Sequence, residues 1–223
     1  MSGALCPLGE NEIHIWHAQI DIDADKLRAL EMLLHADETE RAARFRFPEH
    51  RSRFAAARAV LRIILGRHIG VAPGSLRFSY GEHGKPALAD PANTGVQFNL
   101  SHSAGIAIYA VAPGRRVGVD VERIKAEGSW LQIARQYFAA SEAAELSALP
   151  EETMRARFFE LWSEKEARQK ALGMGLRYPL DRELESGVWK VVKLDPPRGY
   201  AAALAYESLD AGPAIITHQF EMG

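Results

Sequence analysis

The sequence predicts an α+β fold in which two similar α/β halves pack together as an intramolecular pseudo-dimer. The chain has 223 residues, a length that allows one large domain or two small ones. Each half carries one long helical pattern and several short strand patterns, and Pro113–Arg116 interrupts these patterns near mid-chain. We therefore expect an N-terminal half over residues 1–112 and a C-terminal half over residues 113–223.

The first half begins with a strand pattern. Residues 12–20 alternate between two faces, and a helical pattern follows over residues 25–34. Asp37 precedes Glu40 by three residues, which is typical of the N-cap and capping residue of a short helix. A long helix is expected over residues 49–68, where Phe54, Leu61 and Leu65 recur at helical steps. Strands are expected at 76–80, 96–100 and 105–112, with a turn at 81–86.

The second half repeats this series. Its expected elements are a strand at 117–122, helices at 129–138, 141–148 and 153–172, glycines at 173–175 that end the last helix, and strands at 188–194, 200–206 and 215–220.

Composition excludes several classes of protein. The chain carries 27 basic and 29 acidic side chains, a net charge of −2, and is 47% hydrophobic, which is the balance of a globular chain rather than a disordered polyelectrolyte, a fibre or a basic nucleic-acid binder. Cys6 is the single cysteine, so an internal disulfide is impossible and a reducing compartment is expected. No secretory signal and no apolar run of the ~18 residues that span a bilayer is present. We expect a soluble, cytoplasmic monomer with no membrane or nucleic-acid partner.

The first group of residues that can carry chemistry lies in the strand at 117–122. Side chains alternate between the faces of a strand, so Asp120 and Glu122 share one face with Gly118, about 6–7 Å apart at their Cα atoms. Their oxygens can converge on one hard cation such as Mg²⁺, Mn²⁺ or Ca²⁺, and Gly118 is expected to leave open space beside them. The alternative is an exposed strand face with solvated acids.

The second group lies in the helix at 153–172. Glu166 and Lys170 have the i, i+4 spacing of a surface ion pair. They also continue a stripe begun by Phe158 and Trp162 at four-residue steps, which predicts partial desolvation. A buried charge needs a partner or a metal, so this pair is a functional candidate.

Polar turns and a run of arginines offer groups for an anionic ligand. The turn around Ser101 and His102 can donate hydrogen bonds to phosphate oxygens, and Lys85 provides a cation on a rigid turn. Each could equally be an ordinary polar turn. Eight arginines lie between residues 41 and 67, and arginine suits bidentate phosphate contact. The sequence has no P-loop, dinucleotide-binding or zinc-protease motif.

In this order, these segments resemble the 4′-phosphopantetheinyl transferases, specifically the larger pseudo-dimeric kind of the surfactin-synthetase-activator type. Val117–Asp120 matches the family's V/I-G-V/I-D segment, and after 41 residues Trp162–Lys170 matches W/F-S-x-K-E-A/S-x-x-K. Upstream, Gly84–Pro86 and Phe98–Ser103 match G-K-P and F-N-x-S-H-S. The likeness runs from about residue 41 to residue 180.

The resemblance implies a reaction in which coenzyme A and an apo acyl or peptidyl carrier protein give the holo carrier and 3′,5′-ADP, with Mg²⁺ required. It implies metal ligands, catalytic groups and cofactor-binding groups: Asp120, Glu122 and Glu166 for the metal; Glu166 and Lys170 for catalysis; Arg41, Arg44, Arg53, Lys85, Ser101, His102 and Lys170 for coenzyme A. Glu166, or a metal-bound water that it holds, is the expected base for the carrier serine.

Two alternatives remain open at this level. The chain could be a non-catalytic module that binds coenzyme A or a carrier domain, or a metal-dependent phosphohydrolase that uses the same carboxylates. Fatty-acid, polyketide and peptide-synthetase carriers are all possible acceptors.

Overall fold

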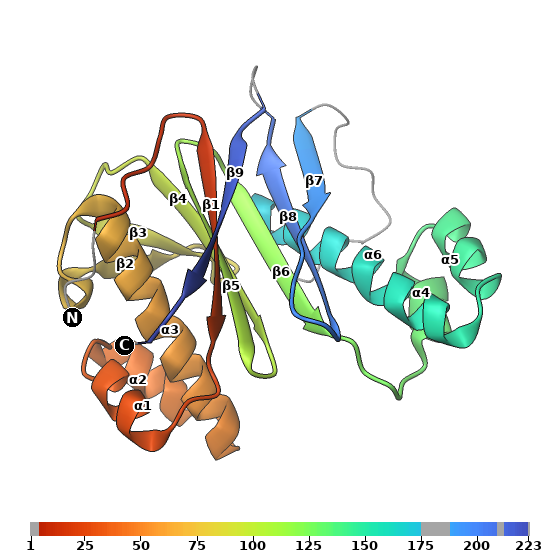
Figure 1. Cartoon of the computed structure of the whole chain (residues 1–223), viewed down its shortest axis with the longest axis horizontal. Helices are drawn as coiled ribbons and strands as arrows, with labels where there is room; N and C mark the ends of the chain where they lie inside the picture. The colour runs from red at the N-terminus through yellow and green to blue at the C-terminus, as the bar shows by residue number, and fades with distance from the viewer. Residues whose placement is uncertain (1–4, 175–187, 209–211, 223) are drawn as a thin grey trace.

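A computed structural model of the chain describes residues 5–174, 188–208 and 212–222. Four layers follow one another across the molecule: a long helix, a first sheet, a second sheet and a second long helix (Figure 1). The fold is therefore α+β with two comparable halves, as the sequence predicts.

The first half is built around a four-stranded sheet with the order β4-β5-β1-β9 and a separate β2-β3 hairpin. Its long helix, α3, covers one face of this sheet and contributes a continuous run of buried side chains to the core. The elements before the mid-chain break are β1 (Glu12–Gln19), α1 (Ala24–Glu31), α2 (Ala36–Ala43), α3 (Pro48–Ile69), the 3₁₀ turn η1 (Pro73–Ser75), β2 (Arg77–Tyr80), β3 (Pro86–Asp90), β4 (Val96–Ser103) and β5 (Ile106–Pro113).

The second half holds a three-stranded sheet with the order β6-β8-β7, against which α6 packs. The small helices α4 and α5 pack near the N-terminal part of α6 around a cluster of aromatic rings. The elements are β6 (Val117–Arg123), α4 (Trp130–Tyr137), α5 (Ala140–Ser147), α6 (Glu151–Leu172), β7 (Trp189–Lys193), β8 (Tyr200–Glu207) and β9 (Ala214–Phe220).

The last strand returns to the first half. β9 pairs in parallel with β1, with Trp16 opposite His218, although it follows the second half in sequence. The sequence predicts the strand itself but not its partner. The division at residues 112 and 113 remains a prediction, and β9 lies across it (Figure 1).

The two sheets meet through an apolar core. Ile13 and Ile15 of β1 pack in one cluster with Val117, Val119 and Val121 of β6, and all five are fully buried. Strands β4 and β6 run side by side at this junction: the backbone N–H of β6 at position 119 donates to the side-chain oxygen of Asn99 at 2.9 Å. This contact lines up polar side chains of β4 with the acids of β6.

Two local expectations are wrong, and one strand was not predicted. Helix α2 begins at Ala36 rather than at an Asp37 cap, because the N–H of His35 donates to Glu38 at 3.2 Å. The stretch at 86–90 forms β3, which pairs with β2. Gly118 faces no open space, because a Cβ there would overlap the backbone of Ala167 and Ala171 in α6.

Candidate active site

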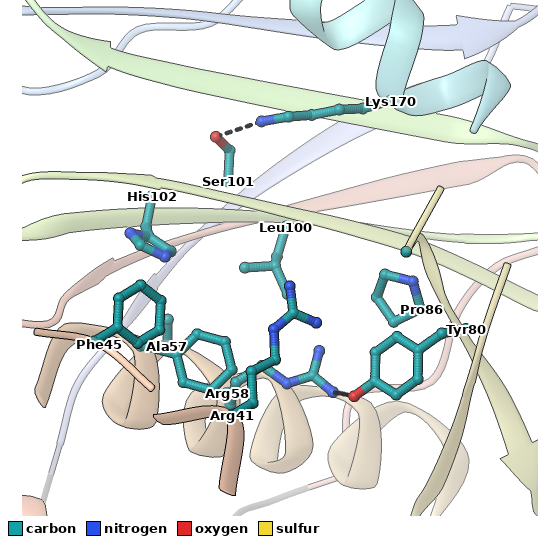
Figure 2. Close-up of a pocket in the computed structure, with 12 residues that line it drawn as sticks. Arg41, Phe45, Ala57, Arg58, Tyr80, Pro86, Leu100, Ser101, His102 and Lys170 are labelled. Carbon is teal, nitrogen blue, oxygen red and sulfur yellow. Dashed lines mark hydrogen bonds between the residues drawn. The ribbon is translucent and has the colours of Figure 1, made fainter. Parts of the chain in front are cut away.

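The candidate site lies where β4 and β6 face the C-terminal turns of α6. Asp120 is 2% exposed, and its Oδ1 accepts hydrogen bonds from Ser101 Oγ at 2.9 Å and from Lys170 Nζ at 2.6 Å. Lys170 also donates to Ser101 Oγ at 2.8 Å (Figure 2). One residue from each of three elements therefore forms a closed, charged triangle.

Glu166 lies one helical turn before Lys170 and is buried. Its Oε1 has no hydrogen-bond partner, and neither has Oδ2 of Asp120. Burial, followed by the charge of Asp120, raises the pKa of Glu166 to about 7. A buried carboxylate oxygen without a partner is costly, so these two oxygens are acceptors that a cation or a hydrogen-bond donor would satisfy.

Glu122 completes the acidic group two residues along β6 from Asp120. Its Oε2 accepts a hydrogen bond from Ser103 at 2.8 Å. Burial raises the pKa of Glu122, and the charge of Asp120 raises it further. The charge of Asp120 therefore raises the pKa of both Glu122 and Glu166, which places the three acids in one electrostatic environment.

The acids fit a hard divalent cation by their chemistry, since all of their donor atoms are carboxylate oxygens and two of these lack partners. Their donor atoms are not all within 4.8 Å of one another. Among the described residues only Cys6, His14 and His218 reach that spacing. The three acids therefore offer the right kind of ligand atom, but their oxygens are spaced more widely than the ligand atoms of Cys6, His14 and His218.

Gly118 determines how close α6 comes to the acids. Because this residue has no side chain, the backbone of α6 packs directly on β6. Lys85 also joins β6 to α6. Its Nζ donates to the carbonyl of Val117 at 3.1 Å and to that of Ala171 at 2.9 Å. Burial, followed by the charge of Arg116, lowers the pKa of Lys85 to about 8. The ammonium therefore fastens strand to helix in this structure.

A pocket of about 310 Å³ opens between this site and helix α3 (Figure 2). Ser101 and His102 lie on opposite sides of β4, so that Ser101 points to Lys170 while His102 points toward Phe45. The His102 side chain stays exposed, and the protein around it, followed by the charge of Lys170, lowers the pKa of its imidazole. The pocket lining combines aromatic and cationic side chains: Arg41, Phe45, Phe54, Ala57, Arg58, Tyr80, Gly84, Pro86, Leu100, Ser101, His102 and Lys170.

A second pocket, of about 320 Å³, lies on the other side of Lys170 and includes Glu166 in its lining. Its lining also includes Lys85, the turn before β3 and the end of α6. Lys170 lines both pockets, as do Gly84, Pro86 and Leu100, so the two pockets adjoin at this lysine. Together the two pockets form a continuous polar and aromatic surface around one lysine.

The arginines predicted as ligands have different positions. Arg41 lines the aromatic pocket, with its guanidinium 5.5 Å from the centre of the Phe54 ring. Arg53 forms an ion pair with Asp21 at 2.6 Å and lines a separate hollow beside the loop after β6. Arg44 lies exposed at the end of α2 and lines none of these three pockets.

Sequence reasoning gave several site residues no role of their own. Arg58 and Tyr80 line the aromatic pocket and are joined by a hydrogen bond of 3.0 Å. Asn99 and Ser103 hold β6 and Glu122. Strand alternation is a signal for these two, because positions 99, 101 and 103 share one face of β4.

Comparison with known proteins identifies the family of the chain. Residues 116–207 match the 4′-phosphopantetheinyl transferase superfamily, and residues 21–114 match the 4′-phosphopantetheinyl transferase N-terminal family. The chain therefore belongs to the 4′-phosphopantetheinyl transferase superfamily, which confirms the family predicted from its motifs.

Three relatives illustrate the similarity. The chain is 37% identical over 207 residues to the 4′-phosphopantetheinyl transferase HetI of Nostoc, covering 87% of each protein. It is 32% identical over 145 residues to 4′-phosphopantetheinyl transferase Sfp of Bacillus subtilis, covering 65% of this chain and 62% of Sfp. It is 31% identical over 149 residues to AcpT of Salmonella typhi, covering 67% of this chain and 69% of AcpT.

Within the described residues, the helices are too short or too polar to cross a bilayer.

Proposed function

We propose that this chain transfers the 4′-phosphopantetheine arm of coenzyme A to a serine of an apo carrier protein and releases 3′,5′-ADP. The observation that carries this proposal is the buried pair Asp120 and Glu166, each with an orphan carboxylate oxygen, beside the ammonium of Lys170. Membership of the superfamily supports the same class of reaction.

The acidic group would hold the divalent cation. Asp120, Glu122 and Glu166 offer only oxygen donors, which suits Mg²⁺ and, as the second choice, Mn²⁺. When bound, such an ion neutralises the charge of a pyrophosphate and so favours attack on it. The rest of the chemistry belongs to the side chains around it.

The aromatic pocket would take the nucleotide end of coenzyme A. Phe45, Phe54 and Tyr80 offer flat apolar surface for a purine, and Arg41 offers a guanidinium for its phosphates. His102 would contribute a neutral hydrogen-bonding group. The arginines 44 and 53 remain predicted phosphate contacts.

Lys85 and Ser101 remain predicted contacts to coenzyme A. In the present arrangement Lys85 donates to two carbonyls and Ser101 donates to Asp120. A phosphate contact by either side chain would therefore replace one of these hydrogen bonds.

Glu166 and Lys170 would move the protons. The carrier serine hydroxyl is a weak nucleophile at neutral pH, so Glu166, or a metal-bound water that it holds, would remove its proton. The serine oxygen then forms its bond to the phosphorus of phosphopantetheine while the bond from that phosphorus to the oxygen of 3′,5′-ADP breaks. Lys170 would donate to the leaving phosphate, which carries the developing charge.

The decisive experiment is a transfer assay. The protein is incubated with coenzyme A, Mg²⁺ and a panel of apo carriers of the fatty-acid, polyketide and peptide-synthetase kinds, and each carrier is weighed by mass spectrometry. The expected result is addition of one phosphopantetheine arm to at least one carrier, with loss of the reaction in Asp120→Asn.

Other outcomes would contradict the proposal. Release of 3′,5′-ADP from coenzyme A without any acceptor would indicate a phosphohydrolase. Calorimetric binding of coenzyme A or a carrier, with no transfer to any carrier of the panel, would indicate a binding module. Full activity of Asp120→Asn would overturn the metal assignment.

A further inference from the structure

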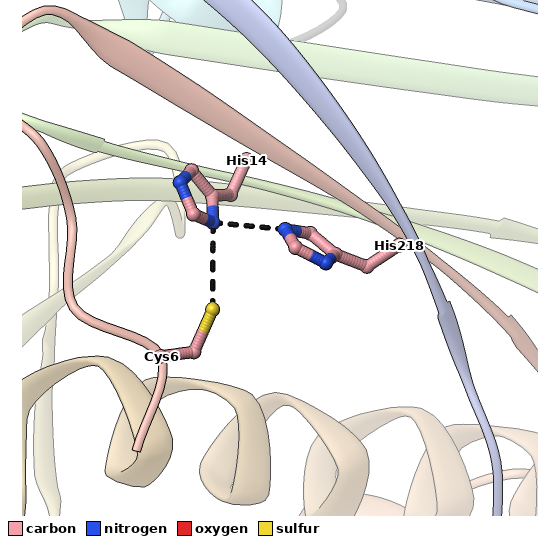
Figure 3. Close-up of side chains that lie close together, drawn as sticks. All are labelled: Cys6, His14 and His218. Carbon is pink, nitrogen blue, oxygen red and sulfur yellow. Dashed lines mark hydrogen bonds between the residues drawn. The ribbon is translucent and has the colours of Figure 1, made fainter. Parts of the chain in front are cut away.

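A second cluster of metal-ligating side chains lies on the far side of the first sheet, away from the acids. Cys6 comes from the segment before β1, His14 from β1 and His218 from β9 (Figure 3). One ligand atom from each lies within 4.8 Å of the others. These three are the only described residues that meet this spacing.

The distances approach those of a tetrahedral site. Cys6 Sγ lies 3.6 Å from His14 Nδ1, and His218 Nε2 lies 2.9 Å from the same nitrogen (Figure 3). Zinc bonds of about 2.3 Å to sulfur and about 2.0–2.1 Å to nitrogen set neighbouring tetrahedral ligands roughly 3.3–3.6 Å apart. Small ring movements would therefore admit an ion between the three atoms.

Glu12 provides an independent sign of a metal site. Its Oε2 lies 3.0 Å from Nε2 of His14, the ring nitrogen that points away from Cys6 and His218. A carboxylate only accepts, so His14 carries its proton on Nε2 and its lone pair on Nδ1 faces the cluster. A carboxylate on the remote nitrogen is the arrangement that usually orients a metal-binding histidine.

The surroundings hold the three ligands in place but leave access from outside. His14 is buried at 4% exposure, whereas Cys6 and His218 are half-buried. The His218 ring stacks on Trp16 with centroids 4.3 Å apart. The backbone N–H of Cys6 donates to the carbonyl of Arg67 at 2.9 Å, which fixes the segment against the end of α3.

We propose that Cys6, His14 and His218 bind one divalent ion of the zinc class, with a water in the fourth position. Sulfur and imidazole donors favour Zn²⁺, Co²⁺ or Cu²⁺ over Mg²⁺. Binding releases the thiol proton of Cys6 and moves the proton of His218 from Nε2 to Nδ1, so that three lone pairs meet at the ion. The ion then ties β9 and the segment before β1 to the same point of β1.

Cobalt titration tests the site directly. The whole protein is held in excess Mg²⁺ and titrated with Co²⁺, and its absorption is recorded. Because Cys6 is the single cysteine of the chain, a thiolate-to-cobalt charge-transfer band reports this site alone. We expect that band, together with the intense visible bands of tetrahedral Co²⁺, and we expect Zn²⁺ to remove both.

Variants separate the site from adventitious binding. Cys6→Ser should lose the charge-transfer band, and His218→Gln should weaken Co²⁺ binding by roughly tenfold or more, as should Glu12→Gln through loss of its contact with His14. His83→Gln, which removes an exposed histidine outside the cluster, should leave affinity unchanged.

Either of two results would overturn the proposal: no charge-transfer band at saturating Co²⁺ in the unmodified chain, or equal affinity in His218→Gln. A measurement that needs no variant is the alkylation of Cys6, which Zn²⁺ should slow and Mg²⁺ should not. Equal alkylation rates with and without Zn²⁺ would also contradict the site. None of these readouts depends on transfer activity.

Discussion

The two long helices occupy equivalent places in the two halves, but the buried carboxylates beside them differ in how they are paired. Helices α3 and α6 each span 22 residues, and each ends at a left-handed glycine, Gly70 with φ 73° and Gly173 with φ 74°. Each packs on the sheet of its own half. Because the two helices share their length, their final glycine and their packing, the difference between the halves lies in the polar side chains buried beside each helix.

The buried carboxylate that faces α3 is paired on both of its oxygens. Glu38 accepts hydrogen bonds from Arg58 Nε at 2.8 Å and from Arg62 Nε at 2.7 Å. Arg62 also donates to the carbonyls of Pro73 at 3.1 Å and Leu76 at 2.9 Å. A buried charge network in which each member has partners is a structural unit, which fixes α2 and the turn before β2 against α3.

Buried charges on α6 remain partly unpaired. Glu166 keeps an orphan oxygen, and so does Asp120 on the strand that α6 covers. The carboxylate beside α3 avoids this cost and the carboxylates beside α6 do not, a contrast that supports our proposal that the acids near α6 hold a ligand. Three experiments test this contrast.

The largest effect is expected for Glu166→Gln. The amide keeps the shape but removes a negative ligand and the proposed base, so transfer to a carrier should fall by roughly 1,000-fold, which is about 4 kcal/mol of transition-state stabilisation. Its stability to urea should not fall, because a buried charge is removed. The measurements are a transfer assay and a urea titration.

Glu164→Gln is the matched control for this variant. Glu164 lies two residues earlier on the same helix, beside Arg157 rather than Asp120. Its activity should remain close to that of the unmodified chain. Equal losses in both variants would mean that helix charge in general, and not Glu166, supports transfer.

A smaller effect, on stability instead of activity, is expected for Glu38→Gln in the first half. Removal of the carboxylate leaves Arg58 and Arg62 buried without their counter-charge, a change that costs about 3 kcal/mol. Urea unfolding followed by circular dichroism measures this loss. If Glu38→Gln were as stable as Glu166→Gln, the distinction between the two helices would be lost.

The smallest effect concerns pH. The pKa of Glu166 is about 7 in the folded chain against 4.5 ordinarily, so between these values the folded state holds a proton that the unfolded state has released. The contribution of Glu166 to stability is therefore complete below pH 4.5, and it is lost as pH rises from 4.5 to 7.

Thermal unfolding in a chelator measures this dependence, with an expected decrease of a few degrees across the window. Glu166→Gln should flatten the decrease, whereas Glu164→Gln should keep it. A steep decrease that persists unchanged in Glu166→Gln would show that another group is responsible.

The sequence alone determines much of this protein because its strongest signals are local. Period-two alternation places Asp120 and Glu122 on one face of β6, and four-residue steps place Glu166 and Lys170 on one face of α6. The spacing of these motifs also predicts the family, and the comparisons with known proteins confirm it.

Tertiary contacts decided what local patterns do not encode. Whether Gly118 faces open space or the backbone of α6 depends on which layer packs on β6, and Lys85 meets carbonyls far along the chain for the same reason. The return of β9 to β1, which joins His218 to His14, is likewise a long-range pairing. Periodicity specifies the face on which a side chain lies, whereas only the packing of distant segments specifies what that face meets.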